Sequence, residues 1–241
     1  MNRSTINESI AQARVVFSHF NINLPPFALW GIEQWQCAGP ECDEIRDCML
    51  GWDVTDFGSG DFAAIGRTLF TLRNGTVLNE AYPKNYAEKY ILDPELQRAP
   101  AHFHRSKRED IINRGGGNIL IELCLATPEN TRSRESFTIQ VDGCTTRVNA
   151  GDTVRLRPGQ SLCIPPRTIH QFWGEEGTGL KIDGVAYSVS GEVSSVCDDR
   201  EDNFFLDAMT RFPEIHEDTE RTHYLCHEYP TARQSELVIV V

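Results

Sequence analysis

The sequence predicts an all-β sandwich or barrel with helical segments towards both ends of the chain. Between about residue 62 and residue 200, apolar and polar residues alternate in short runs rich in Ile, Val, Phe and Thr. Turn signals separate these runs roughly every 8–12 residues, the clearest being Asp142-Gly143. At 241 residues the chain is long enough to bury a substantial core.

The expected elements follow one another along the chain. A helix is predicted over about residues 5–20, because Ile6, Ile10 and Ala13 recur at the spacing of one helical face. Residues 27–60 are expected to mix helix and loop, and a further helix is expected around residues 203–211. The predicted strands lie within residues 66–75, 87–94, 99–104, 117–127, 136–159, 160–166, 168–174 and 180–191.

The sequence contains no internal repeat and no segment with the composition of a linker. Hydrophobic residues make up 40% and charged residues 24%, as in ordinary globular proteins. We therefore predict a single domain over residues 1–241, with a helical extension over about residues 1–60 and a β-barrel core over about residues 62–200.

The charge of the chain argues against two classes of partner. The formal net charge is −12 and the pI is near 5.0, whereas nucleic acids and anionic membranes attract basic surfaces. No run approaches the roughly 18 apolar residues of a membrane span. The first residues, MNRSTINESIAQARVVF, lack the apolar core of a signal peptide. We expect a cytoplasmic protein that binds neither nucleic acid nor membrane.

Eight cysteines are spread over the chain without a C-x-x-C pair. In a cytoplasmic protein they are expected to be reduced thiols, several of them acting as small apolar residues in strands. Cys37, Cys42 and Cys48 could be interpreted as a zinc site, but their spacing is irregular and no fourth ligand lies nearby. The role of these three thiols stays open.

The segment HFHRSKREDIINRGGG, residues 102–117, concentrates the residue types that bind metals. His102 and His104 are two residues apart, so on a strand both imidazoles point to the same side, about 7 Å apart along the chain. Glu109 can add a carboxylate oxygen if the RSKR segment turns back. The best candidate for a further ligand is His170, in PGQSLCIPPRTIHQFWG.

Two features of this segment have alternative interpretations. Asp110 could be the carboxylate ligand in place of Glu109, and alternation along a strand cannot decide between them. Gly115, Gly116 and Gly117 could be taken for a phosphate-binding loop. The lysine and the G-x-G-x-x-G context of such loops are missing, so we expect a hairpin turn instead.

The first segment resembles one signature of the cupin family, G-x5-H-x-H-x3,4-E-x6-G. His102, His104, Glu109 and Gly116 stand at matching positions, while Leu96 occupies the place of the leading glycine. The spacing of this signature favours Glu109 over its neighbour as the ligand.

The second segment resembles the other cupin signature, G-x5-P-x-G-x2-H-x3-N. Gly159, Pro165 and His170 match it. Arg167 replaces the middle glycine and Gly174 replaces the final asparagine, and both departures fall on turn positions rather than on a ligand.

The segments YAEKY, HFHRSKREDIINRGGGNILIEL and GEVSSVCDDREDN are similar to the D-lyxose isomerase family of cupin-fold sugar isomerases. The likeness runs from LPPFALWG to about RFP, and so covers most of the chain. It implies a cupin double-stranded β-helix (jelly-roll barrel) and aldose–ketose isomerisation. It also implies one Mn²⁺-type divalent ion held by three histidines and a glutamate, which here would be His102, His104, His170 and Glu109.

Such a site suits sugar isomerisation. Three imidazoles and one carboxylate leave two positions of an octahedron open, and the ion could be Mn²⁺, Fe²⁺, Co²⁺, Ni²⁺ or Zn²⁺, with Mn²⁺ favoured by the resemblance. The neighbouring carbonyl and hydroxyl oxygens of an open-chain sugar could fill these positions, so that the metal stabilises a cis-enediolate. The expected reactions are D-lyxose to D-xylulose and D-mannose to D-fructose.

Isomerisation also needs groups that carry protons. Glu192, after a long run of strand residues, and Asp183, expected on that strand, are the candidate bases. Lys89 and Lys107 are candidates to donate to sugar oxygens or to stabilise the enediolate. Each of these four residues could instead be a solvated or structural charge.

Some neighbours of the metal ligands are expected to face away from the ion. Phe103 alternates with the two histidines of its strand, so it is assigned to the core. Gln171 and Trp173 lie one and three residues after His170 and also fall on the other face.

Two other functions stay open. An Fe(II)-dependent cupin dioxygenase would use the same ligand types, but its pocket should be apolar, whereas the four charged candidates fit a polyol better. A non-catalytic sugar-binding cupin would bind metal and sugar without turnover. We expect a homodimer, since folds of this kind commonly pair edge strands.

Overall fold

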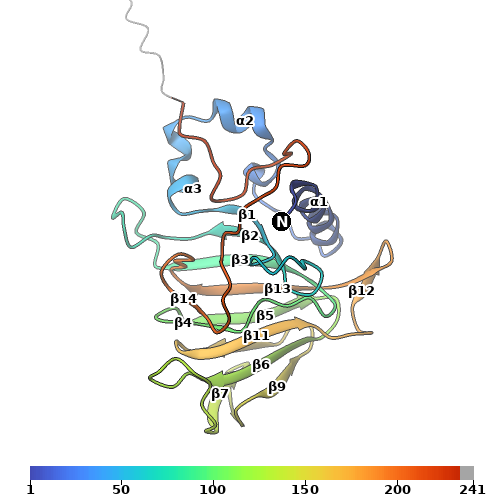
Figure 1. Ribbon diagram of the computed structural model, residues 1–241, viewed down its shortest axis with the longest axis vertical. Coiled ribbons are helices and arrows are strands. Elements are labelled where there is room, and N and C mark those ends of the chain that lie inside the picture. The colour runs from blue at the N-terminus through green and yellow to red at the C-terminus, as the bar shows by residue number, and fades with distance from the viewer. Residues whose placement is uncertain (234–241) are drawn as a thin grey trace, which may run out of the picture.

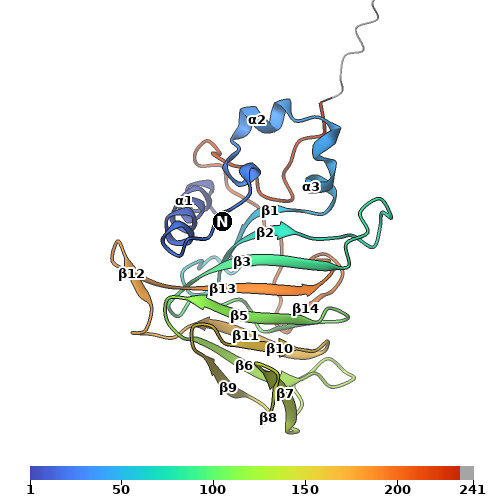
Figure 2. The same ribbon diagram turned by 180° about the vertical axis from the view of Figure 1, so that it is seen from behind.

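Two antiparallel β-sheets packed face to face form the body of the molecule in the computed structural model, which describes residues 1–233 (Figures 1 and 2). The two-sheet architecture predicted from the alternating pattern is confirmed. The single-domain prediction for residues 1–241 stays a prediction, because residues 234–241 lie outside the described part of the chain.

The larger sheet has nine strands. Its order is β1-β2-β3-β13-β5-β10-β7-β8, and β12 pairs with β13 beside this path. The strands are β1 (Gly51–Thr55), β2 (Arg67–Arg73), β3 (Tyr86–Pro94), β5 (Glu109–Gly115), β7 (Phe137–Val141), β8 (Cys144–Val148), β10 (Ser161–Ile164), β12 (Leu180–Ile182) and β13 (Val185–Ser195).

The smaller sheet has five strands in the order β14-β4-β11-β6-β9. They are β4 (His102–His104), β6 (Ile119–Leu125), β9 (Asp152–Leu156), β11 (Thr168–Gly174) and β14 (Asn203–Phe205). Strands that follow one another in sequence alternate between the sheets at several points, as in β4 to β5 and β5 to β6. This crossing brings residues from both sheets to one end of the space between them.

Apolar side chains, nearly all of them aliphatic, fill most of the space between the sheets. They come from both inner faces, because every second residue of a strand points inward. The buried cluster comprises Leu69, Ile91, Ile111, Ile119, Ile121, Leu123, Ile139, Val148, Leu156, Leu162, Ile164 and Phe172.

Helices cover the β1 end of the larger sheet (Figure 1). They are α1 (Arg3–His19), η1 (Pro26–Leu29), α2 (Ile32–Cys37), η2 (Pro40–Cys42) and α3 (Asp43–Asp47). α1 buries its apolar face against the sheet residues Trp52 and Phe70. The helix expected over residues 5–20 is therefore confirmed, starting two residues earlier.

The chain after β14 returns to these helices (Figure 1). The buried guanidinium of Arg3 donates to Glu217 at 2.8 Å and to Glu228 at 3.0 Å. The prediction of a helix around residues 203–211 is wrong, because β14 begins there and pairs with β4. Within residues 1–233 the C-terminal elaboration contains no helix, so only the N-terminal one is helical.

Three other features of the fold differ from the prediction. The sheet begins with β1, within the segment assigned to helix and loop, and the run 180–191 forms two paired strands rather than one. The glycine turn after β5 does not close a hairpin, because β5 and β6 belong to different sheets. Gly116 has φ +88°, and a Cβ there would lie 2.4 Å from the carbonyl oxygen of Tyr187, so this crossing requires glycine.

Two positions where the cupin signatures carry glycine adopt the left-handed conformation in this chain with larger residues. Leu96 has φ +68° and Arg167 has φ +60°. The backbone at both positions thus has the conformation that glycine adopts most easily, although the side chains are larger. Arg167 is held there by its backbone N–H, which donates to the carbonyl of His104 at 2.8 Å, and by its guanidinium, which donates to Thr127.

Candidate metal centre

Three imidazoles converge at one end of the space between the sheets. His102 and His104 lie on β4, and His170 on β11 stands directly opposite His102 in the antiparallel register. Their ring centroids are 4.4–5.5 Å apart, and one ring nitrogen of each lies within 4.8 Å of the others. Alternation along β4, as predicted, directs both of its imidazoles to the same side.

Backbone carbonyls orient two of these rings. His102 Nδ1 lies 2.8 Å from the carbonyl oxygen of Pro100, and His170 Nδ1 lies 3.0 Å from that of Thr168. A ring that donates from Nδ1 leaves Nε2 free to bind an ion. Among the described residues, Nδ1 of His104 has no hydrogen-bond partner although it is buried.

Glu109, the first residue of β5, approaches the histidines from the other sheet. Its Oε1 lies 2.9 Å from His170 Nε2, and its Oε2 lies 3.3 Å from His104 Nε2. The carboxylate is 2% exposed, so nearly all of its interactions are with these neighbours. Asp110, the alternative ligand, is half-buried and does not line this cavity.

Burial and neighbouring charges hold His102, His104 and Glu109 in the protonation states that bind a cation. Burial, followed by the other two histidines, lowers the pKa of His102 well below its usual value; burial followed by Lys107 lowers the pKa of His104. Burial alone would raise the pKa of Glu109, but Lys107 and the two nearby imidazoles outweigh it and hold that pKa well below its usual value. Neutral imidazoles beside an ionised carboxylate fit a divalent ion.

A row of buried charged side chains continues from Glu109. Lys107 Nζ lies 2.7 Å from Glu109 Oε2 and 2.8 Å from Glu192 Oε1. Lys89 Nζ lies 3.7 Å from Glu192 Oε1 and 3.8 Å from Asp199 Oδ2. Lys89 and Glu192 are direct partners across β3 and β13, so the sheet register itself places them together.

The charged side chains in this row keep one another ionised. Burial would raise the pKa of Glu192, but Lys107 and Lys89 outweigh it, so that pKa is lowered. Burial would lower the pKa of Lys107, but Glu109 and Glu192 raise it well above its usual value. The site therefore holds ionised carboxylates and ammonium groups next to each other, away from bulk water.

Comparison with known proteins shows the family of the chain. The sequence model of the D-lyxose isomerase family matches residues 1–229. The chain belongs to the D-lyxose isomerase family. Relatives named D-lyxose/D-mannose isomerase, from Serratia proteamaculans and Escherichia coli O157:H7, are each 45% identical to it over 230 residues, covering 95% of this chain and 98% of the relative.

Solved structures that resemble this family member include L-ribose isomerases. That of Acinetobacter sp. DL28 in complex with L-ribose aligns with a TM-score of 0.58 at 13% identity, covering 90% of this chain and 98% of that one. That of Cellulomonas parahominis with L-ribose has a TM-score of 0.56 at 14% identity and covers 88% and 95%. At this identity the likeness concerns the fold, and it confirms the predicted all-β cupin class.

One predicted catalytic residue of this family member lies outside the site. Asp183 was expected on a strand, but it occupies the turn between β12 and β13 with φ +51°, and it is exposed. Glu192 lies seven residues beyond the start of β13, so the two carboxylates are separated by roughly 20 Å of strand. The expectation that Asp183 lies on a strand is wrong, and its role as a base stays a prediction. The dipeptide Asp183-Gly184 is itself a hairpin-turn signal that could have revealed this.

The aromatic residues beside the ligands divide as alternation requires. Phe103 faces away from the cavity and stacks on Phe204, with ring centroids 4.9 Å apart. Neither Gln171 nor Trp173 lines the cavity. Phe172 does line it, and the guanidinium of Arg67 lies 4.2 Å above its ring.

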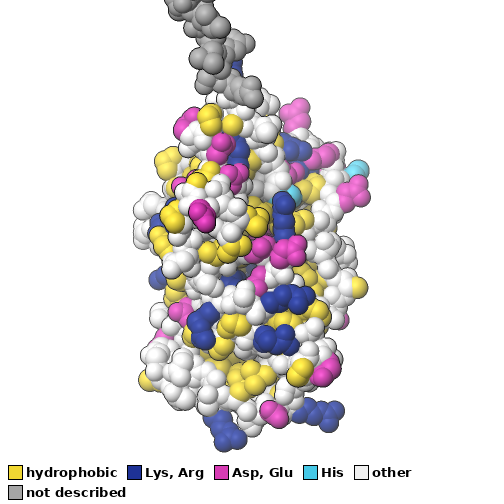
Figure 3. Space-filling model, turned by 90° about the vertical axis from the view of Figure 1, so that its left-hand side faces the viewer, with side chains coloured by type: hydrophobic (Ala, Val, Ile, Leu, Met, Phe, Trp, Pro, Cys, Tyr) yellow, Lys and Arg dark blue, Asp and Glu magenta, His cyan; other side chains and the backbone are white. Residues whose placement is uncertain are grey.

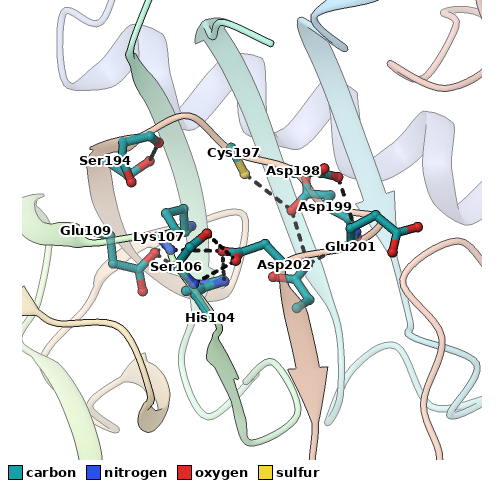
Figure 4. A network of polar contacts seen from close by, with 12 residues as sticks. His104, Ser106, Lys107, Glu109, Ser194, Cys197, Asp198, Asp199, Glu201 and Asp202 are labelled. Atoms are coloured by element: carbon teal, nitrogen blue, oxygen red, sulfur yellow. Dashed lines mark hydrogen bonds and ion pairs between the residues drawn. The ribbon is translucent and has the colours of Figure 1, made fainter. Parts of the chain in front are cut away.

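Several residues of the site were not anticipated from the sequence. Asp199, Asn203, Phe205 and Arg211 line the cavity from the segment that follows β13. Figure 4 shows Cys197, Asp199 and Asp202 of this segment near Lys107 and Glu109. In the sequence, the run CDDRED has the composition of a solvated loop, so its acidic residues carried no signal of burial.

Two further features of the structure, a larger cavity and a second cluster of polar side chains, add little to this centre. The cavity lined by the three histidines and Glu109 has a volume of about 60 Å³. A larger cavity of about 280 Å³ shares Lys89 and Asp199 with its lining. Ligand atoms of Asp53, Cys226 and His227 also converge. Arg211 already forms an ion pair with Asp53, which supplies the positive charge that a second ion would bring.

The alternative zinc site is not supported by the described residues, because Cys37, Cys42 and Cys48 are not among the groups whose ligand atoms converge. Every cysteine of the chain is a free thiol. No described helix is long and apolar enough to cross a membrane. On the face shown in Figure 3, Lys and Arg are interspersed with Asp and Glu instead of forming a continuous basic surface.

Proposed function

We propose that this protein is a metal-dependent aldose–ketose isomerase that acts on free sugars, converting D-lyxose to D-xylulose and D-mannose to D-fructose. One observation carries the proposal. Three histidine rings and the carboxylate of Glu109 come together directly beside the buried ion pair of Lys107 and Glu192. Membership in the D-lyxose isomerase family, and the names of the relatives at 45% identity, agree with it.

His102, His104, His170 and Glu109 would hold the ion. The ligand atoms of the three histidines converge, and Glu109 Oε1 lies 2.9 Å from Nε2 of His170. This oxygen accepts no hydrogen bond among the described residues, which leaves it available as a ligand. A divalent ion bound there supplies Lewis-acid polarisation of a sugar carbonyl, which makes the neighbouring C–H acidic.

Glu192 is the group that takes the carbon proton in this proposal. It is ionised and buried, and its carboxylate is fixed by Lys107 at 2.8 Å and supported by Lys89 at 3.7 Å. A fixed carboxylate can remove the proton from one carbon and return it to the next through a cis-enediolate. Its lowered pKa keeps it in the basic form at neutral pH.

Lys107 and Lys89 stabilise negative charge. The Lys107 ammonium stands between Glu109 and Glu192, so it can donate to an oxygen that becomes negatively charged while the proton is in transit. Lys89 holds Glu192 from the other side and also contacts Asp199. Asp183 has no part in this mechanism, since it lies in a distant turn.

The cavity lining also fits a polyol. Charged groups on one side can bind hydroxyls, and Phe57, Phe172 and Phe205 can cover the C–H faces of the chain. A dioxygenase would need an apolar pocket next to the ion. The buried pair of Lys107 and Glu192 at that place favours isomerisation over oxygen chemistry.

The decisive test is turnover with defined metals. Protein freed of metal should be inactive towards D-lyxose and D-mannose, and adding Mn²⁺ should produce ketose from both. Loading the protein with Fe²⁺ under air should cause no oxygen uptake linked to substrate. Metal-loaded protein that binds sugar but forms no ketose would instead support the non-catalytic alternative.

We further propose Mn²⁺ as the ion, a homodimer as the assembly and the cytoplasm as the compartment. Metal analysis of protein purified without added ions tests the first, and light scattering coupled to gel filtration tests the second. Fractionation of cells that produce the untagged chain tests the third.

A further inference from the structure

Asp202 stands at the junction between the segment after β13 and the strand that carries two metal ligands. It directly precedes β14, whose first residue pairs with His104 on β4. Asp202 is only 8% exposed, whereas the preceding residue, Glu201, is exposed. A carboxylate buried at this place requires partners.

The carboxylate of Asp202 is the acceptor for the whole turn that follows β4. Its Oδ1 accepts from the backbone N–H of Ser106 at 2.7 Å and from its hydroxyl at 2.6 Å. Its Oδ2 accepts from the backbone N–H of Lys107 at 3.0 Å. Figure 4 shows this carboxylate pointing into the turn, next to the ring of His104.

The imidazole of His104 lacks the partner that the other two rings have. His102 and His170 each have a backbone carbonyl within hydrogen-bond distance of Nδ1. Nδ1 of His104 is buried without a partner among the described residues, and Oδ2 of Asp202 lies 3.9 Å from it. A shift of about 1 Å would bring the two atoms to hydrogen-bond distance.

We propose that Asp202 is a positioning residue for the metal centre: it accepts the Nδ1–H of His104 and so directs Nε2 of that ring at the ion. Histidines that bind metals commonly donate their other N–H to a carboxylate or a carbonyl, which fixes the tautomer and increases the basicity of the ligand. The same carboxylate holds the backbone of Lys107, and so one side chain aligns a ligand and the ammonium between Glu109 and Glu192. The inference rests on the proposed metal site.

Asp202→Asn is the variant that tests this role, because the amide has nearly the same shape. One of its two positions must carry an NH₂ group. That group faces either the N–H groups of Lys107 and His104 or the N–H of Ser106, so the variant loses an acceptor whichever way it turns. We expect the affinity for Mn²⁺ and Zn²⁺, measured by calorimetry on metal-free protein, to fall about 10- to 100-fold.

Two controls separate positioning from general support of the turn. Glu201→Gln removes a charge from the exposed neighbour, and Ser106→Ala removes one hydrogen bond to Asp202 without affecting the oxygen that faces His104. Both variants should bind the ions within about twofold of the original protein. If Ser106→Ala weakens binding as much as Asp202→Asn, the effect is structural and the inference is overturned.

A measurement on the unmodified chain keeps the test independent of how the variant folds. In Zn²⁺-loaded protein labelled with ¹⁵N-histidine, all three ligand rings should show a hydrogen-bonded Nδ1–H, and the signal of His104 should change in Asp202→Asn. A His104 whose Nδ1 carries no proton overturns the inference. If the unmodified protein binds no divalent ion, both the proposed metal site and the role of Asp202 are refuted. If ions bind equally to the unmodified protein and to Asp202→Asn, only the role of Asp202 is refuted.

Discussion

The ammonium of Lys107 lies 2.8 Å from the carboxylate of Glu192, and both side chains are almost wholly buried. The two residues come from distant parts of the chain, one from the turn after β4 and the other from the middle of β13. A buried charge is stable only with a partner of opposite sign. The pair therefore contributes to the fold as well as to the proposed proton transfer, and the two contributions can be measured separately.

Replacing Glu192 by glutamine should lower turnover by at least about 10²-fold while leaving metal bound, because the amide cannot accept the carbon proton. Isomerisation in D₂O by the original protein should place deuterium on the carbon that gains hydrogen. The matched control is Glu88→Gln, since Glu88 lies on the neighbouring strand and pairs with Arg73 outside the cavity. Full activity of Glu192→Gln, together with retention of the substrate hydrogen, would rule out this carboxylate as the base.

Replacing His104 or His170 by alanine should remove most of the bound metal and nearly all activity, because each ring supplies one ligand of the proposed set. Chelation of the original protein with EDTA should have the same effect on activity, and Mn²⁺ or Co²⁺ should reverse it. His19→Ala, on the exposed side of α1, is the control and should retain both metal and activity. Metal content is measured by elemental analysis; full occupancy in His170→Ala would refute the assignment.

Replacing Lys107 by methionine should destabilise the metal-free protein by about 3–5 kcal/mol, because Glu109 and Glu192 would then lie buried without their common countercharge. Denaturant unfolding of metal-free protein measures the loss. Added Mn²⁺ should restore part of the stability, since an ion beside Glu109 replaces some of the missing positive charge. Equal stability of the two metal-free proteins would show that the carboxylates are protonated or hydrated.

Replacing Asp183 by asparagine should leave turnover unchanged and change the free energy of unfolding by no more than about 0.5 kcal/mol, because the side chain is exposed in a turn. Asparagine also accepts the positive φ of this position. The assay is the ketose assay used for the Glu192 variant, run beside it. A large loss of turnover without a loss of stability would return Asp183 to the list of catalytic residues.

Replacing Leu96 by glycine should raise the free energy of unfolding, by up to about 1 kcal/mol. A left-handed conformation costs an ordinary residue roughly 1–2 kcal/mol, while glycine loses roughly 0.4–1 kcal/mol more through the entropy of the unfolded chain. The Leu96 side chain is 47% exposed, so little burial is lost. Leu78→Gly is the control: Leu78 is 88% exposed and is not among the residues with positive φ, so it should show no gain.

The local sequence was enough to predict properties that depend only on neighbouring residues in the chain, such as the side of a strand to which a side chain points. The spacing of His102 and His104 places both rings on one side of a strand regardless of what surrounds that strand. The same rule separates Phe103 from Phe172. It failed at Asp183, where a two-residue turn interrupts a run that otherwise alternates like a strand.

Three properties could be predicted from the residues alone: the alternation that builds the sheets, the spacing that lets two histidines and Glu109 approach one another, and the family to which the chain belongs. Which charged side chains are buried together depends on the folded structure. Asp199 and Asp202 lie in a run with the composition of a solvated loop, and Arg211 lies at the end of a segment predicted as helix. All three come close to the site because β14 returns to pair with β4. The physical reason is that burial and ion pairing depend on contacts across the fold, which local periodicity does not record.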